Sequence, residues 1–268
     1  RPAKILERMD FTFTPDPAAG FYLVDWRDDD AVWLLNQLLK KGVNVKVAKQ
    51  EFSVDESPST RKYPAGTLLI PLGIQPDKRE VIEQALARGA ERGTVITSAS
   101  SGLTPSGIDF GSSQFVTVPK PTIAMPVAGG VSPYGAGEIW HLLDTRIGIP
   151  LAMLKQNRFK TADLSAYTTL LFPNGRYQDI SSERWQSIRD WVGRGGTVVA
   201  VGGSAPMVAD AVQGNWATDL EPDSEPELNS SGEPQLPFDS KAKTRKIATT
   251  VGALKRDIFI TINSTQPW

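Results

Sequence analysis

The chain has 268 residues, a formal net charge of −1 and a hydrophobic fraction of 40%. This length favours two domains with real cores, and the near-zero charge argues against a nucleic-acid partner, because such proteins usually carry a clustered basic face. The lack of cysteine excludes disulfides, thiolate catalysis and cysteine-ligated zinc. No apolar run approaches the roughly 20 residues of a membrane helix, so we expect no membrane span.

The chain begins with Arg1 rather than methionine, and no signal peptide precedes the first predicted elements. We therefore expect it to be a piece of a longer protein, whose compartment this sequence does not reveal.

Alternating strand and helix patterns predict a small α/β domain over residues 1–118, after an irregular N-terminal segment. The acids within Asp25–Asp30 are better explained by helix capping than by calcium, which needs oxygen ligands at staggered positions around a glycine turn. The predicted elements are strands at 21–25, 43–48, 66–72 and 94–97, helices at 28–41 and 76–88, and loops at 53–62 and 98–113. Pro71 predicts that the third of these strands ends at a sheet edge.

Pro119 and Pro121 break this pattern, and residues 119–268 predict a second domain. The runs Thr168–Phe172 and Thr197–Val201 are apolar enough to be buried on both faces, as in a parallel sheet. The alternation of elements predicts a flavodoxin-like three-layer sandwich. The predicted strands are 122–126, 150–154, 168–172 and 197–201, and the predicted helices are 138–147, one between the last two strands, and 206–212.

The helix between the last two strands has the clearest signals. Ser181 is its predicted N-cap, and a stripe of apolar residues predicts its buried face. That stripe consists of Trp185, Ile188, Trp191 and Val192. Beyond residue 213 the composition changes: 214–240 is an acidic, proline-rich segment, 241–256 is basic and is predicted to be helical in part, and 257–263 alternates like a strand.

The stretches LLFPNGRY and GGTVVAVGGSA, with the helix between them, resemble the second half of a class I glutamine amidotransferase-like domain. Active members carry a cysteine nucleophile on the sharp turn between strand and helix, at the position that matches Gly202. The resemblance thus implies the fold without its catalytic residue.

Three longer stretches resemble the region that follows the peptidase domain in secreted bacterial zinc carboxypeptidases of the carboxypeptidase A family. They are FYLVDWRDDDAVWLLNQLLKKGVNVKVA, KYPAGTLLIPLGIQPDKREVIEQAL and PYGAGEIWHLLDTRIGIPLAMLKQNRF, and the similarity covers most of residues 20–212. It implies a secreted or periplasmic parent whose zinc is bound by a His-x-x-Glu pair and a distant histidine. The single histidine here, His141, follows Glu138 in the reverse order, so the implied zinc site lies outside this chain, and no cofactor is expected within it.

Two sets of candidate site residues follow. His141, three residues after Glu138 on a predicted helix, is a general base or a ligand-binding donor at a cleft, or simply a histidine held by the neighbouring carboxylate. Ser204 lies on an elbow-like turn, where it is either a nucleophile or, more simply, the N-cap of the next helix. Hydrolase elbows have the pattern G-x-S-x-G, and here Pro206 stands in place of the final glycine. The candidate ligand-binding residues follow the predicted parallel strands, where such sheets bind ligands; they are Gly129, Gly130, Tyr134, Asn174, Gly202 and Gly203.

We therefore expect a non-catalytic accessory region that packs against the parent's peptidase domain or binds a peptide or glycan substrate. The glycine loop at 128–137 matches neither the Walker nor the dinucleotide pattern, although its amides can cradle an anion. Two alternatives stay open. One is an independent hydrolase or transferase that uses Ser204 and His141, and the other is a carbohydrate- or protein-binding module that uses exposed aromatic residues. The spacing of the tryptophans favours core packing over a binding surface.

Overall fold

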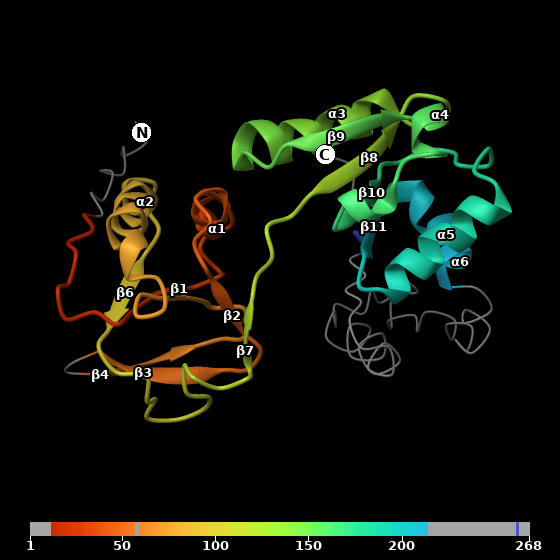
Figure 1. Cartoon of the computed structure of the whole chain (residues 1–268). Helices are drawn as coiled ribbons and strands as arrows, with labels where there is room; N and C mark the ends of the chain where they lie inside the picture. Colours follow the sequence, from red (N-terminus) through yellow and green to blue (C-terminus); the bar gives the residue numbers. More distant parts are fainter. Residues whose placement is uncertain (1–11, 57–58, 214–260, 263–268) are drawn as a thin grey trace, which may run out of the picture. The chain divides into compact units, whose positions relative to one another are not determined.

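The computed structural model describes residues 12–56, 59–213 and 261–262 (Figure 1). These residues form two compact units. The first holds the residues up to Lys120 together with Asp144–Ile149, and the second holds Pro121–Leu143 together with the residues from Pro150 onward. The predicted acidic excursion at 214–240 and the basic segment at 241–256 lie outside the described residues.

The first unit is built on an antiparallel five-stranded sheet with the order β6-β1-β5-β2-β7. Its strands are β1 (Phe21–Val24), β2 (Lys46–Ala48), β5 (Leu68–Pro71), β6 (Ile96–Ala99) and β7 (Phe115–Thr117). The helices are α1 (Ala31–Lys40) and α2 (Arg79–Glu91), the latter preceded by the short helix η1 (Pro76–Lys78).

Both faces of this sheet are covered, because side chains alternate between the faces along each strand. On one face Tyr22 and Val24 join the cluster that contains the buried residues of α1 and α2. On the other face Leu23 joins a cluster that contains Phe52 and Tyr63. The unit therefore has three layers: helices, sheet and a two-stranded hairpin (Figure 1).

Two secondary-structure predictions for this unit are wrong. The loop predicted at 53–62 is instead the hairpin of β3 (Phe52–Glu56) and β4 (Ser59–Tyr63), which buries Phe52 and Val54 on its inner side. The many polar residues of this segment made the alternation of Phe52 and Val54 with polar residues easy to overlook. The predicted edge strand, β5, lies at the centre of the sheet, because Pro71 is its last residue and removes only one donor from the ladder.

The second unit has a parallel sheet with the order β12-β11-β10-β8-β9. Counted along this unit, that is the 2-1-3-4-5 order of flavodoxin-like folds. This confirms the predicted α/β class and its parallel sheet. The strands are β8 (Ile123–Val127), β9 (Leu151–Lys155), β10 (Thr169–Phe172), β11 (Thr197–Val201) and β12 (Thr261–Ile262).

Helices flank this sheet on both sides, with α3 on one face and α5 and α6 on the other (Figure 1). The bounds are α3 (Pro133–Trp140), η2 (His141–Ile147), α4 (Gln156–Phe159), η3 (Leu164–Ala166), α5 (Ser182–Gly193), η4 (Gly202–Ser204) and α6 (Ala205–Gln213). The predicted stripe of α5 is buried as expected, and Ser181 caps the helix by accepting from the Arg184 amide.

The helix predicted at 138–147 begins five residues earlier than expected. Ser132 is its N-cap and Pro133 its first residue, so α3 starts within the stretch that was assigned to a glycine loop. From His141 the helix continues as the π-helical turn η2, in which no residue is buried. The predicted inner side is accordingly not a core face, and Leu142 is exposed.

Candidate functional site

The loops that follow β8, β10 and β11 meet at the carboxyl edge of the parallel sheet. The strand order changes direction between β8 and β10, and open α/β sheets bind their ligands at such a switch point. The amide of Ser132 donates to the Asn174 carbonyl over 2.8 Å. The Asn174 side-chain oxygen in turn accepts from the Gly203 amide over 3.1 Å. One asparagine thus joins all three loops.

The loop after β8 has an unusual backbone. Ala128, Gly129 and Gly130 all have positive φ angles, 64°, 61° and 101°. Such angles are uncommon for alanine, so the surrounding contacts hold this conformation. Gln156 supplies one of them, because its side-chain amide donates to the Gly129 carbonyl over 2.6 Å. Sequence reasoning missed Gln156, although its place directly after β9 at the same edge was an available signal.

The turn after β11 leads directly from the strand into a helix, and Gly202 occupies the position at which the predicted elbow would carry its nucleophile. It passes from strand through η4 into α6, and Gly202 at its start has a φ of 67°. A Cβ on Gly202 would lie 3.2 Å from the Asn174 Cβ, which is tighter than ordinary packing. The turn therefore has no side chain for covalent chemistry at this position and little space for one.

Ser204 is buried within the same turn. It is 0% exposed, and its hydroxyl donates to the carbonyls of Val201, over 2.9 Å, and Phe172, over 3.3 Å. The N-cap role predicted for Ser204 is wrong, because its hydroxyl fastens β11 to β10 instead of accepting from an α6 amide. Glu138 and His141 are both exposed at the end of α3, and no hydrogen bond among the described residues joins either of them to Ser204.

Tyr134, the remaining predicted ligand-binding residue, lies in the first turn of α3 and is 84% exposed. It is close in sequence to a pocket of about 580 Å³ between α3 and the strands β8 and β9. The pocket is lined by Val127, Ala128, Val131, Ser132, Pro133, Ala136, Gly137, Trp140 and Met153. Sequence reasoning missed this pocket, because Trp140 and Met153 carry the pattern of ordinary core residues.

The loop after β10 is held by a buried tyrosine. The Tyr177 hydroxyl donates to the Pro173 carbonyl over 2.7 Å, and burial raises the pKa of this phenol. Replacing Tyr177 by phenylalanine leaves that carbonyl without its partner, and we expect it to cost about 1–3 kcal/mol. Hydrogen exchange of the β10 and β11 amides measures the loss. The same change at exposed Tyr134 is the control, and an equal loss there would contradict the assignment.

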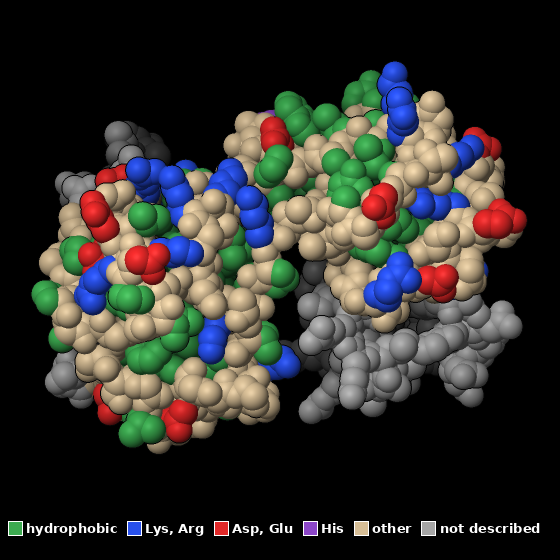
Figure 2. All heavy atoms as spheres, viewed as in Figure 1, with side chains coloured by type: hydrophobic (Ala, Val, Ile, Leu, Met, Phe, Trp, Pro, Cys, Tyr) green, Lys and Arg blue, Asp and Glu red, His purple; other side chains and the backbone are tan. Residues whose placement is uncertain are grey.

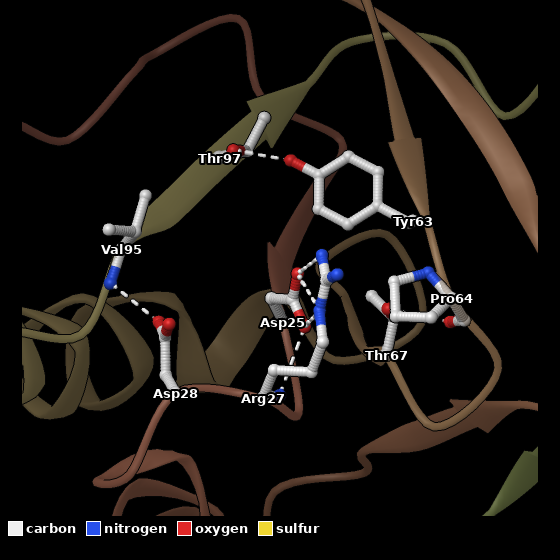
Figure 3. Close-up of polar contacts among 8 residues, drawn as sticks. All are labelled: Asp25, Arg27, Asp28, Tyr63, Pro64, Thr67, Val95 and Thr97. Carbon is white, nitrogen blue, oxygen red and sulfur yellow. Dashed lines mark hydrogen bonds and ion pairs between the residues drawn. The ribbon is translucent and has the colours of Figure 1, made fainter.

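The first unit contains a second polar cluster, at the end of β1 (Figure 3). Asp25 is 4% exposed and accepts from the Arg27 guanidinium, with the shortest contact at 2.6 Å, and from the Arg27 amide. Asp28 accepts from the Val95 amide, and Tyr63 donates to Thr97. Asp25 and Asp28 thus fasten loops, and the predicted helix-capping role is wrong for both.

The ion pair with Arg27 lowers the pKa of Asp25, although burial opposes this shift. A lowered folded-state pKa stabilises the fold above the unfolded pKa of about 3.9 and loses this effect as the pH falls through the folded value. We expect Asp25→Asn to cost about 1–3 kcal/mol at pH 7 and progressively less below about pH 4. Urea unfolding across this range checks it, with exposed Asp29→Asn as the control, and a cost that grows towards low pH would contradict it.

No protein-family model matches this chain, and no curated protein matches it. Among the described residues, no group of three or more histidine, aspartate or glutamate side chains is placed to hold a metal ion. None of the helices that the structure describes is long and apolar enough to cross a membrane.

Proposed function

We propose that this chain is a non-catalytic binding region that accompanies a zinc carboxypeptidase domain. In this proposal the second unit has an amidotransferase-like fold that lacks the nucleophile but still binds a ligand at the carboxyl edge of its parallel sheet. The observation that carries the proposal is the turn at Gly202, which has the backbone of an elbow, no reactive side chain, and a neighbouring asparagine that fills the space.

The chemistry of the neighbouring residues supports a binding role over a catalytic one. A nucleophile needs a base within hydrogen-bond reach, about 2.6–3.2 Å. The Ser204 hydroxyl instead donates its hydrogen bonds to main-chain carbonyls, and His141 is exposed at the end of α3. An independent hydrolase would require Ser204 to give up both of its acceptors.

The partner and the compartment come from the sequence resemblance. The proposed partner is the peptidase domain of the same protein, and the proposed substrate class is peptide or glycan. The protein would act after secretion or in the periplasm, and zinc would be bound by the peptidase domain only. The exposed aromatic residues Tyr134 and Trp140 also favour a role in binding, since aromatic side chains supply contact area at recognition sites.

An assay of two samples tests this proposal. This chain and the product of the complete gene are each given zinc and peptides with free carboxyl termini. We expect zinc-dependent release of the terminal residue by the complete product only, and a reading frame that encodes His-x-x-Glu and a later histidine. Zinc-dependent turnover by this chain alone would overturn the proposal.

A further inference from the structure

The pocket beside α3 lies next to the edge at which a flavodoxin-like sheet binds its ligands. It opens at the end of β8, next to the switch point, and its volume of about 580 Å³ falls within the range of small-molecule sites, roughly 300–1,000 Å³. Its walls come from the second unit alone: α3 on one side, and β8 and the edge strand β9 on the other.

The walls are largely apolar and stay accessible. Trp140 is 40% exposed and Met153 is 50% exposed, so an aromatic ring and a polarisable thioether face the opening. Hydrophobic side chains are visible at the surface over α3 and β9 (Figure 2). Gly137 also lines the pocket, and a Cβ placed on it would meet no atom within 4 Å. The pocket therefore has open space next to this glycine.

The charge beside the pocket is positive. Lys155 pairs in register with Val127, which lines the pocket, and it shares the face of β9 that carries Met153, two residues before it. Lys155 is exposed, and within the described part of the chain no carboxylate lies at ion-pair distance from it. On α3 the lining residues fall on one helical stripe, and Glu138 lies away from that stripe.

Ser132 carries the one hydroxyl in the lining, and the indole N–H of Trp140 is the other side-chain donor. The Ser132 oxygen accepts from the Gly135 amide, which leaves the hydroxyl proton free to donate. A ligand that fits these groups has an apolar body and, at one end, a negatively charged group that accepts hydrogen bonds.

We propose that this pocket binds a small aliphatic or aromatic carboxylate, with its apolar body against Trp140 and Met153 and its carboxylate towards Lys155. This inference rests on the proposed binding role of the second unit and names its ligand class. A free small acid is the occupant, because the volume of the pocket is that of a small-molecule site.

Calorimetric titration of the full chain with 4-phenylbutanoate tests this proposal, with the uncharged 4-phenylbutanol in parallel. We expect the acid to bind more tightly than the alcohol. We expect Lys155→Gln to lower the affinity for the acid by about three- to tenfold and to leave the affinity for the alcohol unchanged. Lys160→Gln is the matched control, and it leaves both affinities unchanged. Equal affinities for acid and alcohol in all three proteins would overturn the carboxylate assignment.

A second variant tests the pocket itself without endangering the fold. Gly137→Leu fills the open space, and leucine favours a helix more than glycine does. We expect it to abolish binding of both probes, whereas Gly193→Leu, at another glycine whose Cβ would meet nothing within 4 Å, binds like the wild type. Wild-type-like binding by the Gly137→Leu protein, or no binding by the wild type, would overturn the site.

Two further outcomes would assign the pocket to another occupant and overturn the proposal. These are tighter binding of a peptide that ends in phenylalanine than of the free acid, and self-association of the chain that 4-phenylbutanoate reverses. The same samples are assayed for zinc-dependent peptide hydrolysis. Turnover would count against the proposed function, whereas absent probe binding counts only against this inference.

Discussion

Replacing Phe172 by alanine is expected to lower the free energy of unfolding of the second unit by about 3–5 kcal/mol. Phe172 is 0% exposed at the end of β10. Its ring lies edge-on to Phe159 and Tyr177, with centroids 5.5 and 5.1 Å away, and stacks on Trp185 at 5.7 Å. Truncation removes these contacts and leaves a cavity that the parallel sheet is too rigid to fill.

Hydrogen exchange of the β10 and β11 amides measures this loss, because it reports on the second unit separately from the first. The control is Phe172→Leu, which keeps most of the volume and is expected to cost clearly less. A loss below about 1 kcal/mol for the alanine variant would contradict the described packing. Phe172 directly precedes the loop that carries Asn174, so we also expect the alanine variant to weaken binding of 4-phenylbutanoate.

Replacing Gly175 by valine is expected to separate the loops after β8 and β10. A Cβ on Gly175 would lie 2.7 Å from the Val131 Cα and 3.0 Å from the Gly130 carbonyl oxygen, so main chain has to move. Such overpacking costs about 1–3 kcal/mol. The bridge between Val131 and Gly175 would break, together with the adjacent hydrogen bond from the Arg176 amide to the Gly130 carbonyl.

The exchange rates of two amides test this prediction. Ser132 and Arg176 donate across the two loops, and both are expected to lose protection in the valine variant. Gly193→Ala is the matched control, because a Cβ there meets no neighbour within 4 Å, and it is expected to leave both rates unchanged. Full protection of both amides in the Gly175→Val protein would show that the loops are not joined as described.

The parallel pairing was predictable from sequence, because Thr168–Phe172 and Thr197–Val201 are largely apolar runs, and β10 and β11 pair in parallel over them. The expected burial on both faces holds for β10, where Leu170–Phe172 are buried, but not for β11, where only Val198 is buried. The hairpin β3–β4 was not predictable in the same way, since β4 (Ser59–Tyr63) has Tyr63 as its one apolar residue and so shows no apolar alternation. Its stability comes from contacts distant in sequence, such as the ring of Phe52 against Phe110 and Phe115.

The candidate site was predictable in part. The residues following parallel strands must meet at one edge, which is why Asn174 and Gly203 could be placed together in advance. The start of α3 was missed because Gly135 and Gly137 were given more weight than the Ser132–Pro133 cap. The burial of Ser204 and the exposure of Met153 were beyond the sequence, because both depend on how neighbouring elements pack.

The proposed binding role requires that the turn at Gly202 carries no working nucleophile. The most direct test is to incubate the folded chain with a fluorophosphonate, which labels activated serines covalently, and to measure the intact mass. We expect an unmodified mass, because the Ser204 hydroxyl is buried and engaged by two carbonyls. A single adduct that maps to Ser204 would contradict it.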